Sequence, residues 1–383
     1  MDHGVFEASD ASPSKPARRG FLQRVRDIIG HLQALDLEAL PGLIAKFEAS
    51  QRSVEAALKI PRPATLEPIS QLELKTLGRY QLENRCRALA NPVYLGDHTA
   101  LCRILGCYKL YVDTADTGFG SHVLLEGYWE MWLTIFFAKH LQRGMTVIDV
   151  GANFGYYSVL FGALVEDTGH VYAVEPNPAV ATRLRRSIDL NGFASRTTIV
   201  EAAAGAVHGA EVILYAPHGE PKNGTVVYSS DMVSQELGTT YEVPQVRLDE
   251  VASGVPRIDF VKIDAEGAEE GVIAGMIGIL KRDRPGLILE FNAARYRDPA
   301  GFLDQLQAIY SRMRYIDYSG DAVTTTASQV VSERWGEDWL LYFDLLSSSV
   351  GPETLHDSSV VGCSTKGGYQ CISKFLDYRK RFS

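Results

Sequence analysis

The stretch Thr146–Ser158, "TVIDVGANFGYYS", decides the fold of this chain. It opens with β-branched apolar residues, which are typical of a buried strand. It then passes through Gly151 and Gly155, which allow a sharp turn and a close approach of the backbone to a ligand. The apolar run "FGYYSVLFGALV" that begins at Phe154 predicts a helix. The stretch therefore predicts a strand, a glycine turn and a helix.

Asp149 lies inside the apolar strand, two residues before Gly151. A buried carboxylate is costly unless a cation or a hydrogen-bond donor meets it. Asp149 is therefore expected to have a partner of that kind.

Strands and helices alternate on the C-terminal side of this stretch. The expected strands are "TVIDVGAN", "HVYAVEPN", "TTIVEAAAG", "IDFVKIDAEG", "GLILEFN", "RYIDYSG" and "WLLYFDLL". Most are followed by a helical pattern, and this alternation predicts an α/β fold with a doubly wound sheet. Ligands of such sheets bind beyond the carboxyl ends of the strands.

Composition limits the class of protein. The chain has 383 residues, 46% apolar residues and a net charge of −9, so no nucleic-acid partner is expected. The five cysteines form no close pair, and we expect reduced structural thiols. No run approaches the ~18 apolar residues of a membrane span, and the N-terminus does not read as a secretory signal. A cytoplasmic protein is expected.

The chain divides into five segments by composition. Residues 1–20 are expected to be disordered, and residues 21–68 to form a helical arm and linker. Residues 69–140 form an α+β lead-in, and 141–350 a sheet domain with a β-rich insert at 206–250. Residues 351–383 form a tail. The apolar faces of the arm favour a homo-oligomer, with a plain structural extension as the alternative.

Two cofactors fit a glycine turn of this kind. The dinucleotide pattern G-x-G-x-x-G requires a second glycine where this chain has Asn153. The alternative, an acid followed by two spaced glycines, suits a ligand with a cationic group, such as S-adenosylmethionine. Glu175 ends the next strand, twenty residues beyond Gly155, where an acid can accept hydrogen bonds from a ribose. Glu175 serves both cofactors, whereas Asp149 and Asn153 favour S-adenosylmethionine.

Taken together, several motifs resemble one family. They are "VIDVGANFGYYS", "VYAVEPNP", "VRLDEV", "IDFVKIDAEGAEEGVIAG" and "LILEFN", with "GYWEMW" before the first strand. This set is similar to the FkbM family of S-adenosylmethionine-dependent methyltransferases, over roughly residues 127–310. The resemblance implies a Rossmann-like class I methyltransferase fold with a mostly parallel seven-stranded sheet and helices on both faces. It also implies methyl transfer to a hydroxyl of a small-molecule acceptor, a sugar or natural-product scaffold.

The resemblance also implies cofactor-binding residues. The turn residues Asp149, Gly151, Ala152, Asn153 and Gly155 would hold the methionine part of the cofactor. Glu175 would hold the ribose, with Pro176 and Asn177 shaping the turn. The adenine would lie near Ala203, where only backbone or apolar contacts are available. Glu130 in "GYWEMW" is expected near the cofactor's ammonium group or the mouth of the site.

Catalytic candidates lie at the ends of the fourth and fifth strands of the sheet domain. Lys262, Asp264 and Glu266 would share one face if the strand persists. Asp264 is the first candidate for a general base or metal ligand and Glu266 the second, with Lys262 setting the charge of a carboxylate. Glu290 ends the next strand. Asp264 and Glu290 together would offer oxygen ligands to Mg²⁺ if they meet.

Weaker candidates and two other functions remain. His122 and His218 are possible bases in glycine-containing segments, and Asn223, Ser229 and Ser230 belong to an expected substrate-side loop. An NAD-dependent oxidoreductase is the alternative within the same fold class. A cofactor-binding scaffold that acts through its N-terminal helices is the alternative from a different class.

Overall fold

The computed structural model describes residues 67–220, 223–227, 236–333 and 336–345. The expected disorder of residues 1–20, nearly all of the arm at 21–68 and the tail at 351–383 lie outside the described residues. Among the residues that are described, no helix has the length and apolar character needed to cross a membrane.

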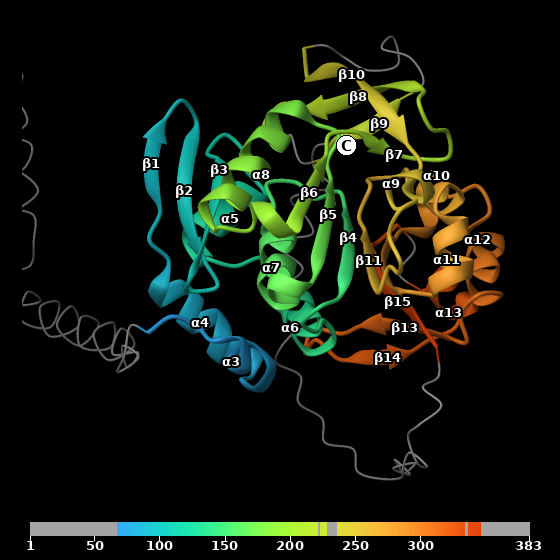
Figure 1. The fold of residues 1–383 in the computed structure, drawn as a ribbon, viewed down its shortest axis with the longest axis horizontal. Coiled ribbons are helices and arrows are strands. Elements are labelled where there is room, and N and C mark those ends of the chain that lie inside the picture. Colours follow the sequence, from blue (N-terminus) through green and yellow to red (C-terminus); the bar gives the residue numbers. More distant parts are fainter. Residues whose placement is uncertain (1–66, 221–222, 228–235, 334–335, 346–383) are drawn as a thin grey trace, which may run out of the picture.

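The main sheet has eight strands and carries the site. Its order is β14 (Ala322–Thr324), β13 (Arg312–Ile316), β15 (Trp339–Asp344), β12 (Gly286–Phe291), β11 (Phe260–Ile263), β4 (Thr146–Val150), β5 (His170–Val174) and β6 (Thr197–Val200). The five strands from β12 to β6 are parallel, whereas β15 is antiparallel to both of its neighbours. The expected mostly parallel sheet is confirmed, with β14 as an additional edge strand (Figure 1).

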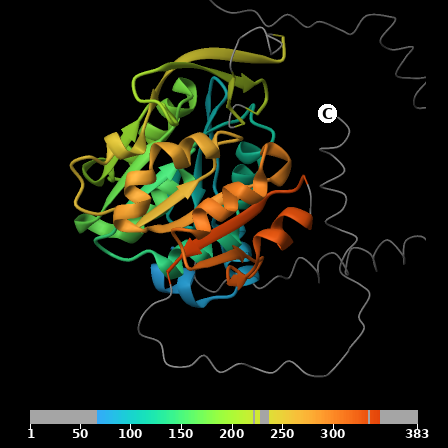
Figure 2. The same ribbon diagram turned by 90° about the vertical axis from the view of Figure 1, so that its right-hand side faces the viewer.

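Two helical layers cover the two faces of this sheet, because successive strand residues point to opposite sides. Val147 of β4 packs in the core under α6 (Met131–His140), α7 (Tyr156–Val165) and α8 (Pro178–Leu190). Ile148, the next residue, packs in the core under α10 (Glu269–Gly275), α11 (Ile277–Asp283) and α12 (Pro299–Gln307). Figure 2 views the molecule from the side of this second layer.

The lead-in packs on the first helical layer. Its elements are α3 (Gln71–Thr76), α4 (Arg79–Leu89), β1 (Val93–Gly96), β2 (Thr99–Ile104), β3 (Tyr108–Asp113) and α5 (Phe119–Glu126). Strands β1 to β3 form an antiparallel sheet. The backbone of β3 binds α8, because Tyr111 N donates to Ser187 Oγ and Lys109 N donates to Asn191 Oδ1.

A second sheet rises beside the carboxyl ends of the parallel strands (Figure 1). It has the order β7 (Ala203–Ala204), β10 (Gly238–Val246), β8 (Glu211–Pro217) and β9 (Thr225–Val227). It includes strands from the segment 206–250. Thr225 Oγ1 donates to the carbonyl of Glu266 at 2.9 Å, so this sheet is bound to the loop that follows β11.

The remaining described elements are short. They are α9 (Leu248–Val251), α13 (Ala327–Ser332) and the 3₁₀ turns Glu166–Thr168, Ala194–Arg196 and Ala293–Arg295.

Candidate active site

A cavity of about 490 Å³ opens at the carboxyl ends of β4, β5, β11 and β12. Its lining includes Gly151, Glu175, Asp264 and Glu290, one from the end of each of these strands. This is the edge at which parallel α/β sheets bind their ligands. The cavity is therefore the candidate active site.

The two glycines of the turn are required by the protein's own packing. Gly151 has φ +71°, and a Cβ there would lie 1.8 Å from the carbonyl oxygen of Asp264. Gly155 has φ +97°, and its Cβ would lie 2.6 Å from Leu184 Cδ1. The sequence predicted that the backbone of this turn comes close to a ligand. The structure shows that the turn also lies close to the end of β11 and to α8, which leave no room for a side chain at either glycine.

Asn153 and Glu175 form one hydrogen-bonded unit on the cavity wall. Asn153 has φ +53°, and its N–H donates to Glu175 Oε2 at 2.9 Å. Asn177 N donates to Glu175 Oε1 at 2.8 Å, and Asn177 also caps α8 through Ala179 N. The buried Oδ1 of Asn153 has no hydrogen-bond partner among the described residues. The unit therefore holds Asn153 and the Glu175 carboxylate next to each other in the lining of the cavity.

The Glu175 carboxylate is buried, and burial raises its pKa to about 7, although the two backbone donors oppose this shift. Its charge therefore changes close to neutral pH. A ligand hydroxyl that donates to the ionised form will bind more tightly as the pH rises.

A small hollow of about 50 Å³ adjoins the Glu175 side of the cavity. Ala203, Pro176 and Gly151 are among its lining residues. Ala152, like Ala203, is buried. The lining also includes Glu175, Asp264 and Glu266, so the hollow is only partly apolar, and an adenine site at Ala203 stays a prediction.

Asp149 meets a cation from within the protein. It is fully buried, Ser158 Oγ donates to its Oδ2 at 2.6 Å, and Lys262 Nζ lies 3.6 Å from its Oδ1. Lys262 is its partner in the register of β4 and β11. Asp149 does not line the cavity. A contact with a cofactor remains a prediction, because the buried charge already has its partner here.

Lys262 lies beneath the cavity and connects two carboxylates. Its Nζ lies 3.3 Å from Asp264 Oδ2 and 5.1 Å from the centre of the Tyr157 ring. Burial lowers the pKa of the Lys262 ammonium, but Asp264 and Asp149 outweigh burial and raise it above its usual value. Burial also raises the pKa of Asp149, which favours its neutral form, whereas the raised pKa of Lys262 favours a charged lysine. We take the lysine as charged, because two carboxylates face it.

Asp264, Glu266 and Glu290 converge, with one carboxylate oxygen of each within 4.8 Å of the others. The reason differs from the expected one. Strand β11 ends at Ile263 and Glu266 has φ +47°, so strand alternation does not continue to Glu266. The three residues meet because β11 and β12 are parallel neighbours and their carboxyl ends share one edge. The predicted meeting of Asp264 and Glu290 is present.

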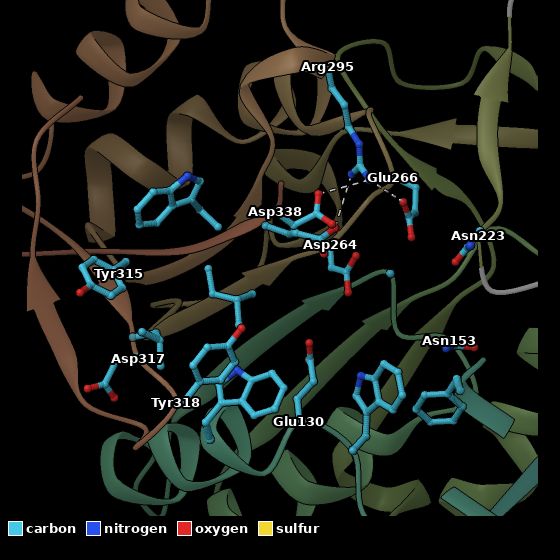
Figure 3. Close-up of a pocket in the computed structure, with 18 of the residues that line it drawn as sticks. Glu130, Asn153, Asn223, Asp264, Glu266, Arg295, Tyr315, Asp317, Tyr318 and Asp338 are labelled. Carbon is cyan, nitrogen blue, oxygen red and sulfur yellow. Dashed lines mark ion pairs between the residues drawn. The ribbon is translucent and has the colours of Figure 1, made fainter. Parts of the chain in front are cut away.

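Arg295 was not anticipated from the sequence. Its guanidinium lies 3.2 Å from Glu266 Oε2, 3.5 Å from Glu290 Oε2 and 3.5 Å from Asp338 Oδ1 (Figure 3). Asp338, just before β15, also accepts from Asn292 Nδ2 at 2.9 Å. Arg295 therefore joins carboxylates from three separate segments. The one available signal was its position, five residues after Glu290 at the same strand end.

Glu290 lies among other acids. Burial raises its pKa well above the usual range, and Asp264, Asp338, Glu266 and Glu130 raise it further. Its Oε2 is buried and accepts no hydrogen bond from the described residues.

Glu130 enters the cavity from the first residue before α6. It has φ +36°, a conformation that costs a non-glycine residue of order 1–3 kcal/mol. Tyr157 OH donates to its Oε2 at 2.7 Å. The expected position of Glu130 at the site is thus present, and its strained backbone aims the carboxylate into the cavity (Figure 3).

Aromatic side chains form the far wall. Trp132 and Tyr318 meet edge to face with ring centres 5.2 Å apart, and Tyr315 and Trp339 do so at 5.4 Å. Figure 3 shows Tyr315 and Tyr318 on the opposite side of the carboxylates from Asn153. We name the end with Asn153 and Glu175 the turn side, and the end with these four aromatic residues the aromatic side.

The weaker candidate residues differ in their positions relative to the cavity. Asn223 lines the cavity, whereas Ser229 and Ser230 lie outside the described residues. His122 lies in helix α5 against the rings of Tyr128 and Trp129, and neither it nor His218 lines the cavity.

The strand order and the acid-lined turn define a class I, Rossmann-like methyltransferase fold. Residues 149–319 match the model of the methyltransferase FkbM domain, so the expected resemblance to this family is confirmed over this part of the chain. The match favours a methyltransferase over an NAD-dependent oxidoreductase, the alternative within the same fold class.

Curated relatives match a shorter segment. Protein-L-isoaspartate O-methyltransferase of Hyperthermus butylicus is 36% identical over 67 residues, which are 16% of this chain and 28% of that protein. The same enzyme of Ignicoccus hospitalis is 36% identical over 63 residues, 16% of this chain and 30% of that protein. The chain thus spans less than a third of the length of these relatives.

Solved structures are similar at low identity. Methyltransferase FkbM from Methylobacillus flagellatus KT is 17% identical with a TM-score of 0.34, over 56% of this chain and 53% of that chain. The tRNA m1G37 methyltransferase of M. jannaschii is 12% identical with a TM-score of 0.33, over 64% of this chain and 54% of that chain.

Proposed function

We propose that this protein transfers a methyl group from S-adenosylmethionine to a hydroxyl of a small molecule, a sugar or a natural-product scaffold. One observation carries the proposal. The turn of an FkbM domain and a group of converging carboxylates line the same cavity. One end suits a cofactor with a ribose, and the centre suits removal of a proton.

The proposed cofactor lies along the turn side. Its ribose hydroxyls donate to Glu175, which two backbone N–H groups hold in place. Its adenine enters the small hollow that Ala203, Pro176 and Val226 help to line. Its methionine part passes Gly151 and Asn153, and the unpaired Oδ1 of Asn153 accepts from its ammonium group. The Glu130 carboxylate faces the same space and offers a counter-charge.

The proposed transfer has one step. The acceptor oxygen attacks the methyl carbon, a C–O bond forms and the C–S bond breaks, and sulfur keeps the electron pair. The hydroxyl proton passes to the carboxylate of Asp264. Because a sugar hydroxyl is a weak nucleophile, both the base and in-line positioning are required. Lys262, 3.3 Å from Asp264, holds that carboxylate in place, with Glu266 as the second candidate base.

Mg²⁺ does not fit as a resident cofactor. Asp264 lies 3.3 Å from Lys262, and Glu266 and Glu290 lie 3.2 Å and 3.5 Å from Arg295. A magnesium ion requires oxygen ligands at about 2.0–2.1 Å in octahedral geometry, and these side-chain cations occupy that space. We derive no step through a metal.

Calorimetric titration with S-adenosylhomocysteine tests the proposal. We expect saturable binding to the wild type and weaker binding to Asn153→Ala, with Tyr315→Phe on the aromatic side as the control. Binding of NAD in place of S-adenosylhomocysteine would contradict the proposal. Cofactor binding without methyl transfer to any acceptor would favour the scaffold alternative.

A further inference from the structure

We propose that the acceptor carries a protonated amine close to the hydroxyl that is methylated, as an amino sugar does. This inference rests on the proposed function and names the class of its substrate. It concerns the centre and the aromatic side of the cavity.

The cavity lining has a strong excess of acidic side chains, of which Glu290 and Glu175 have raised pKa values and gain charge when a cation binds beside them. Seven of its lining residues are acidic and one is basic: Glu130, Glu175, Asp264, Glu266, Glu290, Asp317 and Asp338, against Arg295. Lys262 lies below the lining, between Asp149 and Asp264. The cofactor of the proposed reaction brings a single net positive charge. A cavity of one sign attracts ligands of the opposite sign.

The one lining cation is not available to an anionic acceptor. Arg295 lies 3.2–3.5 Å from three carboxylates, and all three would repel a phosphate or carboxylate group on a ligand. Phosphorylated sugars and nucleic acids are therefore disfavoured. Because the three carboxylates share one guanidinium, each of them keeps lone pairs that can accept a hydrogen bond from a further donor.

Glu290 provides the acceptor atom that an ammonium would meet. Glu290 lines the cavity, and its Oε2 is buried, lies 3.5 Å from the Arg295 guanidinium and accepts no hydrogen bond from the residues that the structure describes. A buried carboxylate oxygen of this kind costs free energy until a donor reaches it. Asp338, which shares Arg295 with Glu290, directly precedes Trp339 of the aromatic side in the chain.

The aromatic side suits the rest of such an acceptor. Trp132, Tyr318, Tyr315 and Trp339 line it, and ring faces attract cations and cover the apolar face of a sugar. Trp132 and Tyr318 already receive one cation: the guanidinium carbon of Arg79, which does not line the cavity, lies 5.6 Å and 5.8 Å from their ring centres. A ring with a hydroxyl and an ammonium group spans this wall and the carboxylates.

A charge series of one sugar ring tests the inference. Glucosamine, glucose and glucose 6-phosphate are titrated into the full-length protein saturated with S-adenosylhomocysteine, with binding followed by saturation-transfer NMR. We expect glucosamine to bind about tenfold more tightly than glucose, because it gains a charged hydrogen bond and a cation–π contact. Glucose 6-phosphate is expected to bind most weakly.

Variants then locate the binding. Glu290→Gln and Asp338→Asn are expected to reduce the preference for glucosamine severalfold, while Glu242→Gln, on the exposed face of β10, keeps it. Absence of glucosamine binding, equal binding of glucose, or tighter binding of glucose 6-phosphate would overturn the inference. The wild-type comparison decides even if a variant fails to fold. Failure of S-adenosylhomocysteine to bind would instead overturn the proposed function.

Discussion

The turn side and the aromatic side of the cavity are built in different ways. On the turn side, backbone groups do the positioning: the N–H groups of Asn153 and Asn177 hold Glu175. On the other side, side chains hold one another, as Arg295 holds Glu266, Glu290 and Asp338. Backbone positioning tolerates little change in the chain, whereas a side-chain network tolerates exchange of its members. This difference suits a constant cofactor beside a variable acceptor.

Gly151→Ala is expected to have the largest effect, because it acts where the turn meets β11. The new Cβ would lie 1.8 Å from a backbone carbonyl that cannot move freely. We expect a loss of roughly 4 kcal/mol or more in the free energy of unfolding, measured by urea denaturation.

The matched control is Gly192→Ala. Gly192 also has positive φ, +73°, but its Cβ would meet nothing within 4 Å. Backbone strain alone should cost about 1–2 kcal/mol there. Equal losses for the two variants would show that the packing of the turn against Asp264 is unimportant.

Asp264→Asn tests the point at which the two sides meet. We expect methyl transfer to fall on the order of a hundredfold or more, because the amide cannot accept the hydroxyl proton. Affinity for S-adenosylhomocysteine, measured by calorimetry, should change little. Asp283→Asn, a carboxylate outside the cavity, serves as the control for nonspecific damage. Unchanged turnover would remove Asp264 from the mechanism and leave Glu266 as the base.

The sequence predicted the turn side well because its residues lie close together in the chain. The strand, the glycine turn and the acid at Glu175 follow from local patterns and one fixed spacing. The need of Asp149 for a partner was also evident. Its partner, Lys262, follows from the register of β4 with β11, and local patterns do not reveal the register of strands so far apart in sequence.

The aromatic side was not predictable in the same way. Arg295, Asp338 and Trp339 come together because β15 inserts antiparallel between β12 and β13, which places Trp339 opposite Phe291. Neither hydrophobic periodicity nor a motif encodes that order of strands. Glu266 shows a second limit, since β11 ends at Ile263 and the strand alternation on which the position of Glu266 was predicted does not reach it.

Arg295→Gln is expected to affect the centre and the aromatic side of the cavity but not the turn side. Loss of the guanidinium leaves three neighbouring carboxylates without their shared counter-charge, so they should spread apart. With any acceptor that the wild type methylates, we expect about a tenfold rise in KM. The affinity for S-adenosylhomocysteine should remain, and Arg295→Lys should restore part of the loss. A parallel fall in cofactor affinity would show that the two sides are not separate.

Glu175→Gln gives a smaller effect that depends on pH and belongs to the turn side. Burial raises the pKa of Glu175 to about 7, so the folded protein holds a proton that the unfolded chain releases near pH 4.5. Its contribution to stability is therefore full below the unfolded pKa and is lost as the pH rises through about 7. Cofactor binding has the opposite trend, because ribose hydroxyls prefer the ionised carboxylate.

The affinity of the wild type for S-adenosylhomocysteine should thus rise about fivefold between about pH 6 and pH 8. Glu175→Gln should show no such rise. Calorimetry at several pH values measures both. A variant that keeps the wild-type slope would assign the titration to another group.

Removal of divalent metal is expected to have the smallest effect on methyl transfer. The experiment shows whether side-chain cations or a metal ion neutralise the carboxylates of the centre and the aromatic side. If Lys262 and Arg295 supply the positive charge, methyl transfer in EDTA should equal that in Mg²⁺. Loss of activity in EDTA that Mg²⁺ restores would contradict this. Asp264, Glu266 and Glu290 would then be metal ligands, and Arg295 would have to move away when the metal binds. The same measurement with Arg295→Gln sharpens the comparison, because only that variant leaves room at Glu266 and Glu290 for a metal to replace the guanidinium.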